Sequence, residues 1–146
     1  ASPFQIGLLT AAEPAGALIT GLALATRRGV PMRPGLMIGG AAGFMVALLA
    51  LPAMPAIWQA VGLLMLGGIG TALFATLQTA IPVTTAPPEA RSRVLGLVTT
   101  CIGMGPLGVL AIGALADARG PGFAIILMAA LGLLLFAVAA PRTLRR

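Results

Sequence analysis

An acidic side chain inside an apolar stretch is the feature of this sequence best placed to do chemistry. Glu13 lies about ten residues into the first apolar run, which at 1.5 Å per helical residue places it about 15 Å deep in a membrane. A carboxylate at that depth is costly and often functional, as a proton carrier or as a contact for a cationic substrate. The alternative is structural: a shallower position, or a hydrogen bond to a neighbouring helix.

Two further groups of side chains are candidates for a site. Gln78 and Thr76 are uncharged polar residues inside an apolar run and could line a cavity, although hydrogen bonding between helices is the commoner use of such groups. Glu89, Arg91 and Arg93 form a short charged break between two uncharged runs. They could pair with a neighbouring helix end and hold one conformation of a moving bundle, or form a solvated loop.

Several classes of function are disfavoured by the residues that the sequence lacks. There is no His and one Cys, and no nucleophile–base pair or phosphate-binding loop is recognisable, so we expect no enzyme, no metal and no cofactor. The nine Arg lie between apolar runs without interleaved aromatic residues. This pattern does not favour nucleic acid as a partner.

The elements that must position these side chains are membrane helices. The chain has 146 residues, of which 59% are hydrophobic and 8% charged, and residues 34–88 and 94–116 carry no charge at all. Crossing a hydrocarbon layer takes about 20 apolar residues of helix. We therefore predict an all-α integral membrane protein in the lipid bilayer, with five transmembrane helices at about residues 3–26, 35–51, 56–80, 94–116 and 122–140.

The arginines predict the orientation of these spans. If successive loops alternate sides, eight of the nine Arg fall on one face of the membrane. Because positive loops stay in the cytoplasm, the N-terminus is predicted outside and the C-terminus inside. Gly35, Gly39 and Gly43 form a ridge of small residues in the second span, which predicts close packing within one bundle in preference to a dimer seam.

Three segments carry a resemblance to a known family: residues 3–17, residues 113–117 and, most specifically, residues 88–97, which read PEARSRVLGL. They resemble the C-terminal half of a major facilitator superfamily transporter, helices eight to twelve of twelve, and within that family the bacterial efflux proteins of the enterobactin-exporter type. The resemblance covers nearly the whole chain. One departure is Ala25, which stands where the family's signature loop has an acid.

The resemblance implies part of a secondary transporter in the bacterial cytoplasmic membrane that exports small amphipathic molecules by alternating access. We expect proton coupling through Glu13, a role that the resemblance does not supply, because family members need not have an acid at this position. Five helices form only a partial C-terminal bundle, so the implied partners are a missing N-terminal half or other membrane subunits, besides the small-molecule substrate. Because the sequence starts at Ala1 rather than Met, we expect either that an upstream segment has been removed or that the chain is a piece of a longer protein. The alternative is a structural subunit that packs against a larger membrane complex without transporting.

Overall fold

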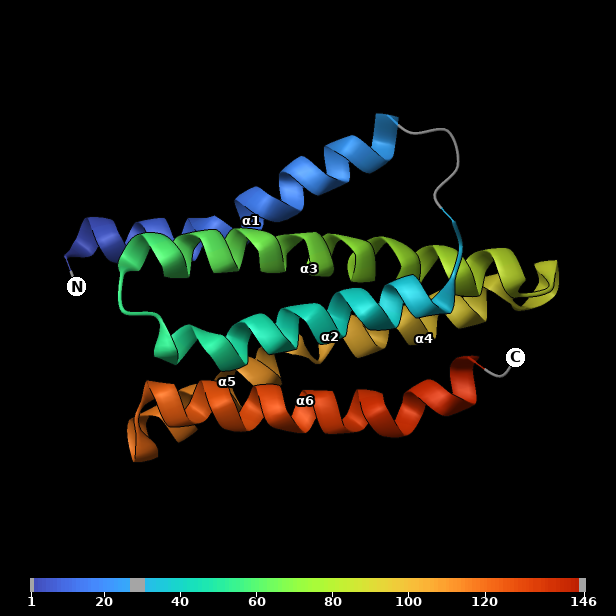
Figure 1. Ribbon diagram of the computed structural model, residues 1–146. Helices are drawn as coiled ribbons and strands as arrows, with labels where there is room; N and C mark the ends of the chain where they lie inside the picture. The colour runs from blue at the N-terminus through green and yellow to red at the C-terminus, as the bar shows by residue number, and fades with distance from the viewer. Residues whose placement is uncertain (1, 27–30, 145–146) are drawn as a thin grey trace.

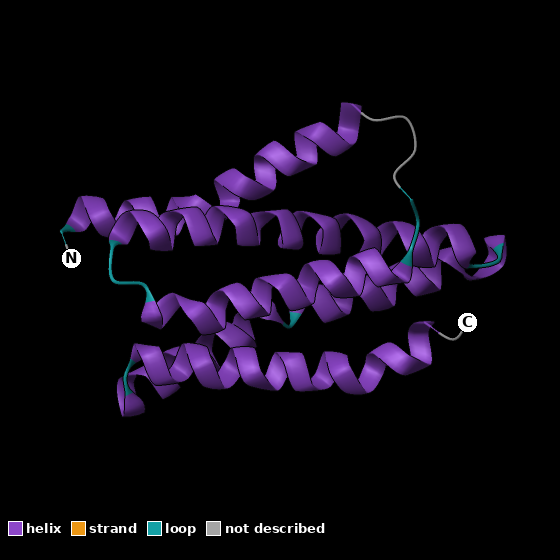
Figure 2. Ribbon diagram, viewed as in Figure 1, coloured by secondary structure: helices purple, strands orange, loops and turns teal. Residues whose placement is uncertain are grey.

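Helices make up nearly all of the chain in a computed structural model that describes residues 2–26 and 31–144, with side chains as far as residue 141. No strand occurs among these residues (Figure 2). In chain order the elements are α1 (Pro3–Thr26), α2 (Pro34–Ala50), the 3-10 turn η1 (Leu51–Ala53), α3 (Ile57–Thr85), the 3-10 turn η2 (Pro88–Ala90), α4 (Arg91–Gly103), α5 (Gly105–Arg119) and α6 (Pro121–Leu144).

These elements form five stretches that are long and apolar enough to cross a membrane. They are α1, α2 with η1, α3, the continuous stretch from η2 to α5, and α6. The prediction of an all-α membrane fold with five transmembrane helices is therefore confirmed by length and composition.

Helix α3 is the centre of the arrangement. It packs against α1, α2 and α4, while α2 also contacts α6, and α6 contacts α5 (Figure 1). The two termini lie at opposite ends of the molecule, as an odd number of crossings requires (Figure 1). Helix α3 also carries seven buried residues, all small or apolar, which is more than any other helix in the described part of the chain.

Helix α3 is longer than predicted. The sequence predicts an end at residue 80, before Pro82, but the helix continues through Pro82 to Thr85. The hydroxyls of Thr84 and Thr85 support this last turn by donating to the carbonyls of Ala80 and Ile81, each over 2.8 Å. The helix ends at Ala86, whose extended backbone is the conformation favoured directly before a proline.

The fourth span is broken, although the sequence analysis predicts one helix over residues 94–116. Helices α4 and α5 meet at Met104, just before Gly105 and Pro106. Pro106 has no N–H to donate and its ring crowds the carbonyl four residues earlier, so an unbroken helix is disfavoured there. At the end of α4, the Met104 amide donates to the carbonyls of both Thr100 and Cys101, at 3.2 and 3.3 Å, so the last turn of α4 tightens before the break.

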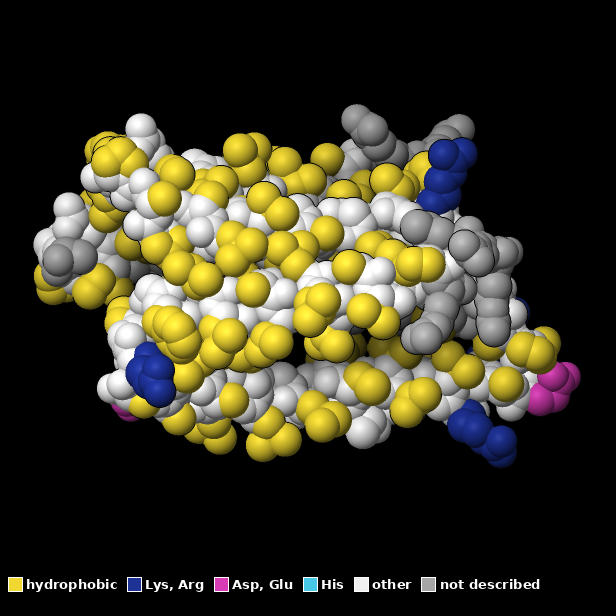
Figure 3. Space-filling model, turned by 60° about the horizontal axis from the view of Figure 1, so that its bottom comes forward, with side chains coloured by type: hydrophobic (Ala, Val, Ile, Leu, Met, Phe, Trp, Pro, Cys, Tyr) yellow, Lys and Arg dark blue, Asp and Glu magenta, His cyan; other side chains and the backbone are white. Residues whose placement is uncertain are grey.

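The surface between the two ends of the molecule is apolar. Large hydrophobic side chains such as Leu110, which is 71% exposed, point outward, and no polar side chain is fully buried among the described residues. On the face shown in Figure 3, the charged side chains lie toward the two ends and leave an uncharged band between them. This is the pattern of a protein whose solvent in the middle is lipid.

Candidate functional site

The crossing of α1 and α3 is built on two glycines. Gly16 of α1 lies against the backbone of Met65, and Gly68 of α3 lies against the backbone of Glu13 and Ala17. A Cβ atom at either glycine would overlap those backbone atoms, so the two helices can approach this closely only where side chains are absent. Beyond the crossing, the C-terminal half of α1, which contains Pro14, turns away from α3 (Figure 1).

Glu13 meets a partner at this crossing. The Thr71 hydroxyl donates to Oε1 of Glu13 over 2.5 Å, and both side chains are half-buried. Among the side chains that the structure describes, this is the one hydrogen bond that joins side chains of two different helices. The Thr71 oxygen also lies 3.1 Å from the carbonyl oxygen of Gly68, one turn earlier in its own helix.

The surroundings of this pair are otherwise without charge. Glu13 is the one charged residue of α1, and the sequence of α3 contains none. Both Glu13 and Thr71 lie near the middle of their helices, away from the charged ends. A carboxyl group in such a place can take up and release a proton, or can bind a cation that enters the crossing.

Gln78 lies at a second place on α3. It is half-buried in an open apolar pocket of about 290 Å³, to which α1 contributes no residue. The other lining residues come from α2, α3 and α4: Met37, Phe74, Ile81, Pro82, Leu97, Val98 and Cys101. Thr76 is exposed and does not line this pocket. The three predicted site residues Glu13, Gln78 and Thr76 are therefore not brought together.

The charged break lies at the turn between α3 and α4. Glu89 belongs to η2, Arg91 and Arg93 open α4, and all three are exposed. The Arg91 side chain donates from Nε to the carbonyl of Ala86 over 3.3 Å. In this conformation Arg91 stabilises its own turn, and the predicted contact with a neighbouring helix end stays a prediction. Arg27, Arg28, Arg145 and Arg146 lie outside the described residues.

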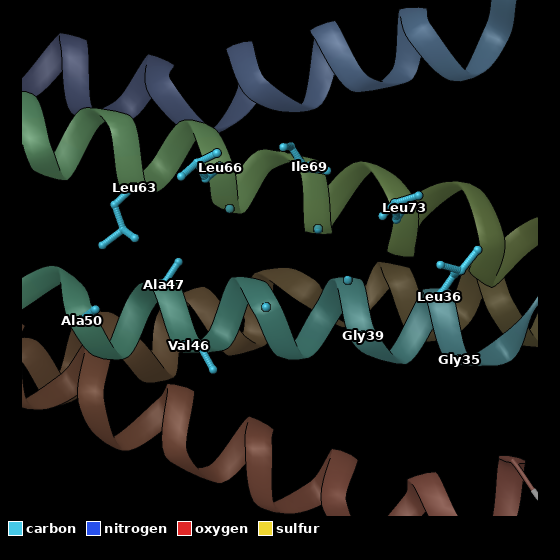
Figure 4. Close-up of a pocket in the computed structure, with 14 residues that line it drawn as sticks. Gly35, Leu36, Gly39, Val46, Ala47, Ala50, Leu63, Leu66, Ile69 and Leu73 are labelled. Atoms are coloured by element: carbon cyan, nitrogen blue, oxygen red, sulfur yellow. The ribbon is translucent and has the colours of Figure 1, made fainter. Parts of the chain in front are cut away.

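The predicted glycine ridge faces a groove. Gly35, Gly39 and Gly43 line an open apolar groove of about 470 Å³ between α2 and α3, whose far wall includes Leu66, Ile69 and Leu73 (Figure 4). A Cβ atom at Gly39 or Gly43 would meet nothing within 4 Å. The close contact between α2 and α3 is made instead by Gly40, which is buried against Gly70. Within the described chain, α2 therefore packs closely against α3 at Gly40 and not at the predicted ridge.

Thr71 is the site residue that the sequence analysis misses. It is one of several Thr in the apolar runs, and no charged residue near it in the sequence distinguishes it from the others. The available signal is its place directly after Gly67, Gly68 and Gly70, because glycines mark where another backbone can come close enough for a short hydroxyl to reach it. Even so, the partner helix cannot be identified from that signal.

One of three comparisons with known proteins gave a match, and that match covers the whole chain. The model of the family described as Major Facilitator Superfamily matches residues 1–146, and so includes both the α1–α3 crossing and the charged turn before α4. A comparison with curated proteins and one with solved structures gave no match. Among the described residues, no group of three His, Cys, Asp or Glu side chains could hold a metal ion.

Proposed function

The chain belongs to the Major Facilitator Superfamily, and from that premise we propose that it is part of a secondary transporter, not an enzyme, that exports small amphipathic molecules by alternating access and couples export to protons. In such transporters, substrate and coupling ions bind near the middle of the membrane, and one helical bundle rocks against the other around that site. We therefore expect a group that binds a coupling proton at mid-span.

The observation that carries this proposal is the Glu13–Thr71 pair. Its carboxyl group is the only ionisable one on α1 and α3, it lies near mid-span, and it stands on the contact between these two helices. A purely structural role needs only a neutral hydrogen-bonding group, which avoids the cost of a charge in the membrane interior. The presence of an acid here, in place of a neutral group, supports proton uptake and release as the role of Glu13.

The distribution of charge supports a cytoplasmic membrane location with the N-terminus outside. The start of α2, the turn between α3 and α4 and the end of α6 lie at one end of the molecule, and the turn between α5 and α6 lies at the other (Figure 1). Arg33, Arg91 and Arg93 belong to the first end, whereas Arg119 belongs to the second. By the positive-inside rule the first end is the cytoplasmic one.

The transport unit in this proposal contains more than the five spans. Transporters of this family are expected to place the substrate between two helical bundles, so an N-terminal half, or other membrane subunits, would supply the opposite wall. In this arrangement the five spans are helices eight to twelve, and the Gln78 pocket on α3 is the candidate contact for the apolar part of a substrate.

The test is proton-coupled efflux by the full-length protein in lipid vesicles, with ethidium as an amphipathic probe and a pH-sensitive dye trapped inside. We expect the wild type to move ethidium and protons in opposite directions. Glu13→Gln keeps a hydrogen-bonding side chain but cannot ionise, so proton movement driven by ethidium should fall to background. The matched control is Asp117→Asn, which likewise replaces a carboxyl group by its amide, at an exposed position late in α5. Unchanged proton movement in Glu13→Gln would refute the coupling role.

A further inference from the structure

The Thr71 hydroxyl has one proton and two acceptors within reach. Its oxygen lies 2.5 Å from Oε1 of Glu13 and 3.1 Å from the carbonyl oxygen of Gly68. A hydroxyl group donates one hydrogen bond and can accept others. At any moment Thr71 therefore donates either across to α1 or back to its own helix, and the protonation state of Glu13 decides which acceptor is the better one.

We propose that Thr71 is a positioning residue that transmits the protonation state of Glu13 to the α1–α3 crossing; this rests on the proposed proton coupling at Glu13. With Glu13 ionised, Thr71 donates to Oε1. When the carboxylate takes a proton from water, its new O–H donates to the Thr71 oxygen, and the Thr71 proton turns to the Gly68 carbonyl. The Thr71 hydroxyl only rotates, and none of its covalent bonds breaks. In the reverse step, Glu13 returns the added proton to water.

The second acceptor, the Gly68 carbonyl, connects the reversal of this hydrogen bond to the shape of α3. Gly68 is the residue of α3 against which the backbone of Glu13 and Ala17 rests. Donation from Thr side chains to carbonyls of the preceding turn bends helices. Protonation of Glu13 should therefore strengthen the bond from Thr71 to Gly68, bend α3 at the crossing, and shift α1 relative to α3. Loss of the proton reverses the shift.

No other charge lies on the two helices that form this crossing. Of the other helices packed against α3, α2 carries no charge, and α4 carries Arg91 and Arg93 in its first turn, at one end of the molecule. Glu13 is on α1, which packs against α3, and neither α3 nor the rest of α1 contributes an ionisable side chain. The remaining acids of the chain, Glu89 and Asp117, lie at helix ends in η2 and late in α5. A change of protonation at the crossing can thus be assigned to Glu13 alone.

Infrared difference spectroscopy between acidic and alkaline buffer tests the switch in the full-length protein in lipid, with glycine carbonyl carbons labelled with ¹³C. In the wild type we expect a protonated carboxyl band, absent from Glu13→Gln, together with a shifted glycine carbonyl band. Thr71→Val has the shape of Thr without its hydroxyl. It should keep the carboxyl band at a higher frequency, because the hydrogen-bond partner is gone, and lose the glycine change entirely.

Two control variants separate this role from a structural one. Thr71→Ser should restore both bands, and Thr79→Val, at an exposed position on the same helix, should leave both unchanged. A glycine change that survives in Thr71→Val would overturn the inference while leaving proton coupling at Glu13 in place. Absence of any carboxyl band that depends on Glu13 would overturn both the coupling and the switch.

Discussion

Helix α3 meets its two principal neighbours through glycines, Gly70 against Gly40 of α2 and Gly68 against the backbone of Glu13 in α1. Toward α2, the groove beside the contact is lined by glycine and aliphatic residues alone. Toward α1, the same kind of close approach holds a carboxyl group and a hydroxyl group together. The two contacts share their packing and differ in their chemistry.

This difference indicates that Glu13 is not required for helix packing. Helix α2 contains no polar side chain, so it packs against α3 without a polar pair, because small residues and van der Waals contact suffice to associate helices in a membrane. The carboxyl group on the other side of α3 therefore adds a cost without being needed for association. Variants that disturb packing and variants that disturb the polar pair should separate these two contributions.

The largest effect is expected at the two glycines of α3 whose missing side chains face the backbone of another helix. Gly68→Ala and Gly70→Ala each place a Cβ onto backbone atoms of the opposite helix, so both should lower the free energy of unfolding, by about 1–3 kcal/mol. Unfolding of the full-length protein in mixed detergent micelles measures this. If only one of the two variants is destabilised, the packing of the two contacts is not equivalent.

A smaller loss of stability is expected from Thr71→Val. It removes the hydrogen bond between α1 and α3 and should lower the free energy of unfolding by about 1 kcal/mol, the scale of such bonds between membrane helices. The control is Thr20→Val, since the Thr20 hydroxyl donates within its own helix, to the Gly16 carbonyl over 2.9 Å. Equal losses in the same unfolding assay would contradict a bridging role for Thr71.

Gly67→Ala should have less effect than Gly70→Ala, although both residues face α2. The Cβ added at Gly67 would lie 2.9 Å from the ring of Phe44, and a ring at the end of a side chain can shift where a backbone cannot. We expect a loss below about 1 kcal/mol. A loss as large as that of Gly70→Ala would show that Phe44 is held as firmly as the backbone.

The smallest effect is expected from the double variant Gly39→Ala, Gly43→Ala. Neither new Cβ meets an atom of the described chain, and Ala favours a helix over Gly, so the free energy of unfolding should not fall and should rise by at most about 1 kcal/mol per substitution. A clear loss in the full-length protein would mean that another helix occupies the groove. The glycine ridge would then carry the packing that the sequence predicts for it.

The sequence predicts the five spans because long uncharged runs leave few alternatives to membrane helices. It predicts the break at Met104 less well, even though Gly103, Gly105 and Pro106 are visible in it, since prolines are tolerated in membrane helices when the backbone finds other partners. Pro82 shows the opposite outcome, because α3 passes through it to Thr85. Which proline breaks a helix depends on neighbouring hydrogen bonds that composition does not reveal.

The sequence by itself determines that this chain spans a membrane, that its charges lie at the helix ends, and that Glu13 is the exception. These follow from the cost of charge in hydrocarbon, which acts on each helix separately. The tertiary structure alone decides that Glu13 meets Thr71 and that Gly40, not the ridge beside it, touches α3. One residue along a helix turns the side chain by about 100°, so such pairings depend on how each helix is rotated against its neighbour.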